Sequence, residues 1–368
     1  MARVILAMSG GVDSSVAAHL LCAEGHEVLG LFMRHGQPLQ EACSSAAGGS
    51  DSSLLPIIAQ SAHKRGCCTA EDAADARRVA DRMDIPFYAV DFESEFERII
   101  DYFVDEYTQA RTPNPCVMCN NWLKFGKLFD YADSVGAEFV ATGHYAQLEG
   151  APRRLCRGLD PSKDQSYVLF GIEREILPRL LFPVGGHSKV QIREIAHDLG
   201  LFVADKRDSQ DICFVASGEH ANFVRQRRGE VDTSGNIITL DGSVVGQHGG
   251  IEKFTIGQRK GLGIALGEPQ FVLHIEKASH EVTIGPREAL ARRELILQRT
   301  NWLVDPPSQS FRCQVSIRYN SPATEAGVFP LSDGRFRVEF DSARYGVAPG
   351  QAAVCYDGRY VLGGGWIE

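Results

Sequence analysis

A glycine pair between a short apolar run and a helical pattern is the feature that most constrains this chain. Residues 4–8 are typical of a buried strand, and residues 9–15 (SGGVDSS) follow at once, opening a helix from Ser14 to about Glu24. Two glycines let the backbone turn tightly and approach an anion without interference from a Cβ atom. The N–H groups at the start of the helix then face that anion. The string predicts a phosphate-binding turn in an α/β fold; the alternative is a serine-capped turn with no ligand.

The residue types in this loop narrow the kind of phosphate site. No Gly-Lys-Ser/Thr sequence follows the glycines, so the loop is not a Walker A motif. Ser9, Ser14 and Ser15 add hydroxyl donors. Asp13 is a poor phosphate ligand because of its charge, so we expect it to hold a Mg²⁺ ion that bridges phosphates.

The rest of the first half alternates short apolar runs with helical patterns. Three further strands are predicted, at residues 27–33, 87–91 and 139–142. Thr69 with Asp72 resembles a capping box and predicts a helix that continues to about Met83. Strands separated by helices predict a doubly wound parallel sheet covered on both faces. Residues 36–62 interrupt this order without periodicity and predict a flexible surface insertion.

The pattern changes twice further along the 368 residues, a length that suggests two or three domains. After about residue 217, closely spaced glycines predict a small, loop-rich central domain. From residue 294, short strands separated by turn signals are typical of a small barrel or sandwich. We therefore expect an α/β domain over residues 1–217, a central domain over 218–293 and a β domain over 294–368.

Charge and hydrophobicity limit where the protein can be located and what it can bind. No apolar run is long enough to cross a bilayer, and the N-terminus lacks the pattern of a signal peptide, so the default expectation is cytoplasmic. The formal net charge of −9 argues against a general nucleic-acid coat but leaves room for a local basic groove. Candidate clusters are residues 187–189, 225–228 and 259–260, each of which is otherwise a solvated face.

Cysteines supply the second chemical signal. In residues 112–120 (TPNPCVMCN), two prolines flank Asn114 and predict an extended segment that presents Cys116 and Cys119 on a loop. Farther on, Cys213 follows two basic residues in residues 206–214 (KRDSQDICF), and nearby cations raise the thiolate fraction of a cysteine. The adjacent Cys67 and Cys68, before the second helix, are interpreted as structural thiols.

Two polar strings accompany these cysteines. Residues 141–145 (ATGHY) end the predicted strand 139–142 at the carboxyl edge of the sheet, where doubly wound folds bind ligands. Residues 163–167 (KDQSY) form a polar turn that enters a helix. The first of these strings predicts a ligand site at this edge.

The loop resembles that of N-type ATP pyrophosphatases, which split ATP into AMP and pyrophosphate. All these strings in this order, with residues 254–262 (FTIGQRKGL), resemble the bacterial tRNA-specific 2-thiouridylases. The resemblance spans nearly the whole chain, including residues 318–319 and 349–351. It implies an ATP-pyrophosphatase domain, a small central domain and a C-terminal β-barrel. The implied activity is adenylation of the C2 oxygen of a wobble uridine in tRNA, followed by sulfur transfer that yields 2-thiouridine, AMP and pyrophosphate.

The same resemblance implies roles for particular residues. Cys213 would carry a persulfide sulfur delivered by a relay protein or cysteine desulfurase, and Cys119 would release that sulfur and end in a transient disulfide with it. ATP would be bound by Ala7, Met8, Ser9, Gly10, Gly11, Val12, Asp13, Ser14, Met33 and Gly143. The tRNA would be bound by Asn114, Pro115 and Cys116 at the target base, and by His144, Lys163, Asp164, Gln165, Arg318, Tyr319 and Gln351.

One position departs from the family pattern, because its best-studied members carry Asp where this chain has Cys116. Cys116, Cys119 and Cys213 could therefore hold three corners of a [4Fe–4S] cluster that leaves one iron open for sulfide. A zinc site would lack an evident fourth ligand, and a redox dithiol at Cys116 and Cys119 is a further alternative. Amide-forming ligases and amidotransferases use the same kind of loop, but nitrogen transfer needs no thiols. A nucleotide- or RNA-binding protein without activity would need neither thiol.

Overall fold

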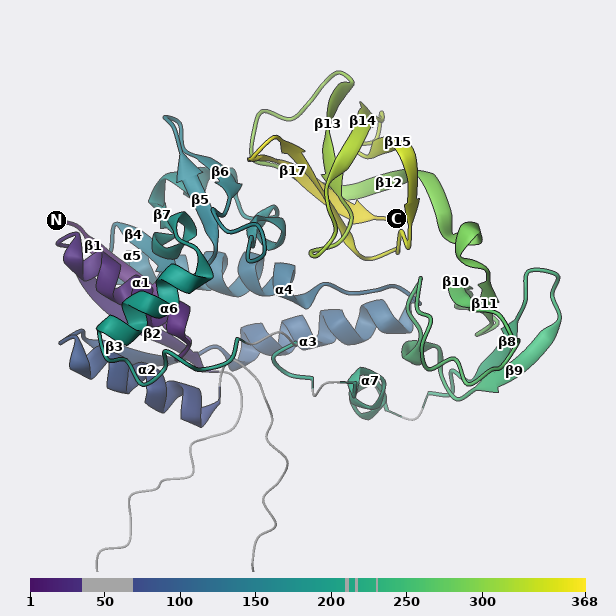
Figure 1. Cartoon of the computed structure of the whole chain (residues 1–368), viewed down its shortest axis with the longest axis horizontal. Helices are drawn as coiled ribbons and strands as arrows, with labels where there is room; N and C mark the ends of the chain where they lie inside the picture. Colours follow the sequence, from purple (N-terminus) through teal and green to yellow (C-terminus); the bar gives the residue numbers. More distant parts are fainter. Residues whose placement is uncertain (35–68, 209–211, 216–217, 230) are drawn as a thin grey trace, which may run out of the picture.

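The computed structural model describes five stretches of the chain, residues 1–34, 69–208, 212–215, 218–229 and 231–368. They form an α/β lobe at one end, a β-barrel and a small central sheet (Figure 1). Helix α3 (Glu93–Thr108) extends from the α/β lobe toward the central sheet. The insertion predicted at residues 36–62 and the pair Cys67 and Cys68 lie outside the described residues.

A five-stranded parallel sheet, with strand order β3-β2-β1-β4-β7, forms the α/β lobe. Its strands are β1 (Arg3–Ala7), β2 (Glu27–Arg34), β3 (Phe87–Asp91), β4 (Phe139–Thr142) and β7 (Leu180–Leu181). The four predicted strands are confirmed, and β7 at the edge was not predicted. Val4 and Leu6 of β1 belong to one core cluster and Ile5 to another, because successive strand side chains point to opposite faces.

Helices cover both faces of this sheet. One core cluster includes side chains of α1 (Val12–Ala23), α2 (Ala70–Arg82) and α6 (Lys189–Asp198); the other includes α3 and α5 (Leu128–Ser134). The predicted capping box opens α2, since Thr69 Oγ1 accepts the Asp72 N–H at 3.1 Å and Asp72 Oδ2 accepts the Thr69 N–H at 3.0 Å. The predicted doubly wound fold is confirmed.

The segment that carries Cys116 and Cys119 is helical, so the prediction of a loop was wrong. Residues Pro115–Met118 form the short helix α4, and the π-helical segment η1 (Cys119–Lys127) continues it. Proline is well tolerated at the first helical position, where its missing N–H has no intrahelical partner. The Asn114 side chain caps this end by accepting the Val117 N–H at 3.4 Å.

The C-terminal strands close into a six-stranded antiparallel barrel. Their order is β12-β15-β14-β13-β16-β17, and pairing of β12 with β17 closes the ring. This settles the choice between barrel and sandwich. The strands are β12 (Ala291–Trp302), β13 (Phe311–Ser316), β14 (Thr324–Pro330), β15 (Phe336–Tyr345), β16 (Ala352–Asp357) and β17 (Tyr360–Ile367).

A hairpin of the α/β lobe continues this barrel sheet. Strand β6 (Arg154–Arg157) pairs with β17 through Cys156 and Tyr360, and β5 (Ala146–Glu149) pairs with β6. The hairpin follows β4 after three residues. The two lobes therefore share one hydrogen-bonded sheet, which the sequence did not predict.

The central part is built on a four-stranded sheet of order β10-β11-β8-β9. Its strands are β8 (Gly235–Ile238), β9 (Val244–His248), β10 (Phe271–Ile275) and β11 (Val282–Gly285), and helix α7 (His220–Arg228) precedes them. Short 3₁₀ turns are η2 (Ser166–Leu169), η3 (Arg174–Arg179), η4 (Pro183–Gly186), η5 (Ile251–Lys253) and η6 (Arg287–Leu290). No helix in the described stretches has the length and apolar character needed to cross a membrane.

A fully buried carboxylate, Glu252 of η5, holds α7 against the central sheet. Arg225 Nε donates to its Oε1 at 2.5 Å and Thr233 Oγ1 to its Oε2 at 2.7 Å. Arg228 lies 3.7 Å from the same carboxylate. Burial acts to raise the pKa of Glu252, but the bonds from Thr233 and Arg225 outweigh it and hold the pKa below its ordinary value.

We expect Glu252→Gln to lower the free energy of unfolding by about 3 kcal/mol at neutral pH, because two guanidinium groups lose a buried counter-ion. The lowered pKa means that this stabilisation is present above about pH 4.3 and is lost as the pH falls through the folded pKa. Urea unfolding at several pH values measures both effects. Glu276→Gln is the control, since Glu276 pairs with His274 at the surface; equal losses in the two variants would contradict the role given to Glu252.

Candidate active site

The glycine loop joins β1 to α1 in a conformation that its neighbours fix. Gly10 has φ +70°, and a Cβ there would lie 2.2 Å from the Asp72 carbonyl oxygen at the start of α2. The hydroxyls of Ser14 and Ser15 donate to the Gly11 carbonyl at 3.1 and 2.8 Å. The loop is therefore shaped by contacts within the chain before any ligand arrives.

The start of α1 faces this loop without a side-chain cap. Gly11 is the N-cap residue and has no side chain that could cap the helix. Among the described residues, no side-chain cap accepts a hydrogen bond from the first-turn N–H groups of α1. First-turn N–H groups lack intrahelical partners and, with the helix dipole, favour a bound anion. The predicted phosphate site is thus geometrically available.

The other predicted ATP-binding residues lie at the carboxyl ends of neighbouring strands. Gly143 follows β4, and a Cβ there would lie 2.9 Å from the Ser14 amide nitrogen, so β4 and α1 pack closely at this glycine. Met33 is partly buried near the end of β2. Met8 is buried, and its sulfur packs against Gly30. Their roles toward ATP stay predictions.

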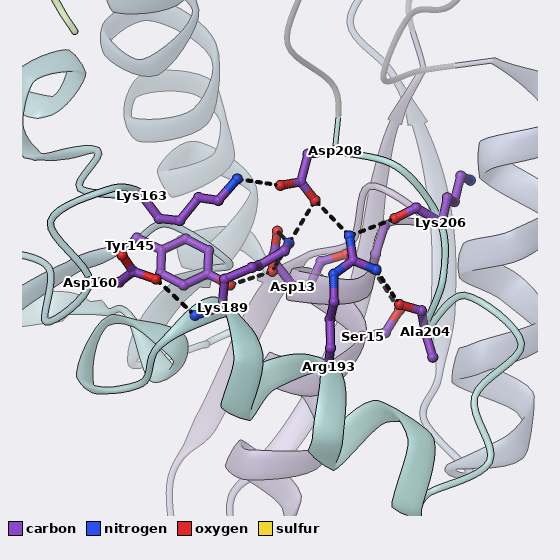
Figure 2. Close-up of polar contacts among 12 residues, drawn as sticks. Asp13, Ser15, Tyr145, Asp160, Lys163, Lys189, Arg193, Ala204, Lys206 and Asp208 are labelled. Carbon is purple, nitrogen blue, oxygen red and sulfur yellow. Dashed lines mark hydrogen bonds and ion pairs between the residues drawn. The ribbon is translucent and has the colours of Figure 1, made fainter.

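Asp13 in the first turn of α1 is held by two groups that the sequence did not single out. Lys189 Nζ, at the start of α6, contacts the two carboxylate oxygens of Asp13 at 2.7 and 2.9 Å, and Tyr145 Oη donates to Oδ1 at 2.7 Å (Figure 2). Burial and the negative charge of Asp13 both raise the pKa of Tyr145. Asp13 is therefore paired with a cation within the chain.

A second carboxylate, Asp208, gathers three cations beside this pair (Figure 2). Lys163 Nζ lies 2.7 Å, Lys189 Nζ 2.8 Å and Arg193 Nη2 3.3 Å from its oxygens. Burial acts to raise the pKa of Asp208, but the bonds from Lys163 and Lys189 outweigh it and lower the pKa. Arg193 also donates to the carbonyls of Ala204 and Lys206 at 2.5 and 3.1 Å, which fixes the segment before Cys213.

Lys206 connects that segment to the loop. Its ammonium donates to the Gly10 carbonyl at 3.0 Å and pairs with Asp72 at 2.8 Å and Asp75 at 2.6 Å. The sequence suggested that Lys206 activates Cys213, but its ammonium instead contacts the loop and α2. Lys206 therefore supports the phosphate loop.

Cys116 and Cys119 lie where α4 passes into η1. Cys116 is exposed and Cys119 half-buried. Gln351 Nε2 donates to the carbonyls of Thr112 and Pro113 at 3.2 and 2.9 Å, which anchors the segment that precedes α4. The barrel residue Gln351 thus positions the stretch that carries these cysteines.

Cys213 is half-buried in a turn anchored by the next residue. The Phe214 ring contacts those of Phe96, Phe103 and Phe223, with centroids 5.5, 5.2 and 5.4 Å away. Cys213 and Cys119 pack against the same hydrophobic core, and both α4 and η1 contact α3, the helix that carries Phe96 and Phe103. Both thiol-bearing segments are therefore built on α3.

The described residues contain no group of three or more His, Cys, Asp or Glu side chains arranged to hold a metal ion. Cys116, Cys119 and Cys213 all lie in that part of the chain, and they do not form such a group. Asp13 offers a single carboxylate, which suits a Mg²⁺ ion held chiefly by phosphates.

Several residues predicted to bind tRNA, at the target base or elsewhere, come together between the α/β lobe and the barrel. Burial, with smaller effects of the charges of Asp164 and Cys116, raises the pKa of Tyr319 to about 12. Burial also raises the pKa of Tyr167, which a hydrogen bond with the Asn114 side chain partly offsets. Asn114, Cys116, Asp164 and Tyr319 thus line one region.

Other residues predicted to bind tRNA are engaged inside the protein. His144 is buried; its Nδ1 lies 2.6 Å from Thr142 Oγ1, and burial, with a smaller effect of Lys124, lowers its pKa far below the ordinary value. Arg318 donates to the carbonyls of Ile256 and Gly346 at 3.2 and 2.7 Å.

The remaining members of this set have similar internal bonds. Gln165 Oε1 accepts the Tyr145 N–H at 2.9 Å, and Asp164 pairs with Arg157 at 3.1 Å. These internal bonds show that each side chain has a structural role. Binding of tRNA by the same side chains stays a prediction.

The three candidate basic clusters also differ in whether their side chains are engaged inside the protein or exposed. Lys189 is buried in the site, whereas Arg225 and Arg227 pair with Glu252 and Glu97. Residues 259–260 are exposed. Of the three clusters, only the last is exposed at each of its residues.

Three family models match the chain from end to end. They are described as a tRNA methyl transferase HUP domain over residues 2–217, a tRNA methyl transferase PRC-barrel domain over 221–286 and an aminomethyltransferase beta-barrel domain over 292–367.

Curated relatives include tRNA-specific 2-thiouridylase MnmA of Rhodopirellula baltica, 54% identical over 100% of this chain and 96% of its own length. The protein of the same name from Geotalea uraniireducens is 46% identical over 100% of this chain and 95% of its own. Among solved structures, a predicted subunit of tRNA methyltransferase from Methanocaldococcus jannaschii covers 54% of this chain and 76% of its own, with 15% identity and a TM-score of 0.32.

Proposed function

This chain belongs to the tRNA-specific 2-thiouridylase family, and we propose that it replaces the C2 oxygen of a wobble uridine in tRNA with sulfur at the expense of ATP. The observation that carries this proposal is the similarity to proteins of that name over the whole of this chain. The chain is thus a tRNA-uridine 2-sulfurtransferase, with tRNA and ATP as substrates.

The first half-reaction uses the loop. The uridine C2 oxygen attacks the α-phosphorus of ATP, pyrophosphate leaves, and the oxygen becomes part of an adenylate. First-turn N–H groups of α1 and the loop backbone stabilise negative charge on the departing pyrophosphate. Mg²⁺ at Asp13 would screen the same charge, with the phosphates as its main ligands. The products of this step are adenylated tRNA and pyrophosphate.

The second half-reaction uses Cys213 and Cys119. A relay protein or cysteine desulfurase first loads a persulfide on Cys213. The Cys119 thiolate attacks the inner sulfur, the bond to the terminal sulfur breaks, and hydrosulfide leaves with the bonding electron pair. Hydrosulfide then attacks C2 of the adenylated uridine, AMP leaves with its oxygen, and 2-thiouridine remains. A thiol reductant must cleave the resulting Cys119–Cys213 disulfide before the next cycle.

The same reaction with sulfide carried on a [4Fe–4S] cluster is the second candidate. It needs three thiolates around one cluster. We place the persulfide route first because it is the route that the family resemblance implies. An amide-forming ligase on the same loop is disfavoured because it leaves Cys119 and Cys213 without a task.

The target base would be held where the α/β lobe meets the barrel. We propose that Asn114, Pro115 and Cys116 line the base, with Tyr319 beside Cys116. Gln351 supports this stretch through the two carbonyls before Asn114, and its predicted contact with tRNA would come in addition. Sequence-specific RNA recognition favours bases exposed in loops, which suits an anticodon loop.

The remaining predictions concern organisation and surroundings. We propose domain limits at residues 1–217, 218–293 and 294–368, on the change from the parallel sheet to the central sheet and then to the barrel. A cytoplasmic location fits the need of both thiols to be reduced between cycles.

The persulfide route predicts that Cys116→Ser retains at least about a third of the wild-type rate of tRNA thiolation, because the exposed Cys116 only borders the base and losing one such contact costs about 0.6 kcal/mol. Protein purified without oxygen is assayed for 2-thiouridine, AMP and pyrophosphate, with iron and labile sulfide measured on the same sample. Activity without bound iron supports the persulfide route. Activity that tracks iron and is lost in Cys116→Ser assigns the cluster instead, and failure to thiolate any tRNA would refute the proposed function.

A further inference from the structure

Lys189 is a buried lysine that lies against the phosphate loop and has no assigned role. Its side chain is 10% exposed, and its ammonium contacts Asp13 at 2.7 Å and Asp208 at 2.8 Å. The Tyr145 ring lies 5.7 Å from the same nitrogen. On the basis of the function proposed above, we propose that Lys189 is a further residue for that reaction, which binds the pyrophosphate portion of ATP opposite the first turn of α1.

The first argument is the charge at the loop. Asp13 belongs to the first turn of α1, so its carboxylate lies beside the N–H groups that would receive phosphate. A lone carboxylate there would repel an incoming anion. The Lys189 ammonium cancels this charge in the folded protein, which leaves the positive end of the α1 dipole available to phosphate oxygens.

The second argument is that one Lys189 contact is redundant. Two of its three contacts go to the same carboxylate, at Asp13 Oδ1 and Oδ2. Asp13 Oδ1 also accepts from Tyr145 Oη at 2.7 Å. One N–H of Lys189 can therefore pass from Oδ1 to a phosphate oxygen, and Asp13 keeps a partner on each oxygen.

The third argument is that Asp160 and Asp208 fix the position of Lys189. Its backbone N–H donates to Asp160 Oδ2 at 3.0 Å, and Asp208, which accepts its side chain, is fixed by Lys163 and Arg193 (Figure 2). The ammonium thus needs little reorganisation when a ligand binds. Preorganised cations of this kind stabilise charge that develops on a leaving group.

The test measures binding of inorganic pyrophosphate and of AMP to the full chain by calorimetry, with Mg²⁺ in excess. We expect Lys189→Met to weaken pyrophosphate binding about 10- to 100-fold, the usual range for one charge-assisted hydrogen bond, and to change AMP binding by no more than about twofold. Lys189→Arg, which keeps the charge, should recover part of the loss. Lys163→Met is the matched control, because it removes one cation from the same Asp208 cluster but not from Asp13.

Each other outcome has a distinct meaning. If Lys189→Met binds pyrophosphate like the wild type, or loses AMP and pyrophosphate equally, Lys189 is structural and the inference is wrong. An equal pyrophosphate loss in Lys163→Met would assign the effect to the charge of the whole cluster and would also overturn it. A wild-type chain that binds neither ligand would instead refute the proposed use of ATP.

Discussion

Cys213→Ser should abolish tRNA thiolation, with a loss of at least about 1000-fold, while tRNA-dependent release of pyrophosphate from ATP persists. A serine hydroxyl cannot carry a persulfide, so no alternative nucleophile replaces the missing sulfur. The substitution should leave the fold intact, because the Phe214 ring anchors the turn. Assaying 2-thiouridine and pyrophosphate on the same reaction separates the two half-reactions.

Cys22→Ser is the control for this variant. Cys22 of α1 is exposed, but partial burial of its thiol raises its pKa and so lowers its thiolate fraction. We expect wild-type thiolation from it. Thiolation that survives in Cys213→Ser would remove Cys213 from the sulfur path, and loss of pyrophosphate release together with thiolation would give it a structural role.

Gly10→Ala should eliminate ATP-dependent pyrophosphate release. The added methyl group would lie 2.2 Å from the Asp72 carbonyl oxygen, closer than any real contact, and the residue would keep φ +70°. The loop or the start of α2 must therefore move, and a displacement of about 1 Å at a reacting group can cost about 100-fold in rate. Pyrophosphate release in the presence of tRNA is the measurement.

Gly25→Ala is the control that separates the effect of a positive φ from the steric clash expected in Gly10→Ala. Gly25 has φ +81°, but a Cβ there meets no atom within 4 Å. We expect a stability loss of about 1–3 kcal/mol, the usual cost of such a conformation, and normal activity in the folded protein. If the two alanine variants lose activity alike, steric exclusion at Gly10 is not the reason.

The sequence predicted the α/β sheet because two kinds of local signal agreed there. Apolar runs marked β1 to β4, and Thr69 with Asp72 marked the start of α2, so little depended on distant contacts. The loop was predictable for the same reason, since its glycines lie between a strand and a helix. Elements that depend on partners far along the chain, such as β7 and the hairpin β5–β6, gave no comparable signal.

The thiol segment shows how a local signal can mislead. Two prolines around Asn114 favoured an extended chain, but Pro115 occupies the first position of a helix that Asn114 caps. The same residues are compatible with an extended segment and with a helix, until the first residue of the helix is known. Packing of this segment on α3 decides between them.

Lys189 could not have been assigned from sequence for a related reason. In the sequence it belongs to a short basic stretch, and its partners Asp13 and Asp208 lie 176 positions before it and 19 after it by numbering. Only the fold brings the start of α6 to the start of α1. Tyr145 was similarly hidden, although it ends the string that marked the sheet edge.

The shared sheet between the α/β lobe and the barrel limits how the protein can be divided. From β4 the chain runs through Tyr145, which holds Asp13, directly into β5, and the hairpin β5–β6 then pairs with barrel strand β17. A barrel from a relative cannot be grafted at a linker, because the edge that receives β6 must match its register. A force that a bound RNA exerts on the barrel would reach the phosphate loop through β17, the hairpin β5–β6 and Tyr145. The barrel and the phosphate loop would therefore be mechanically coupled.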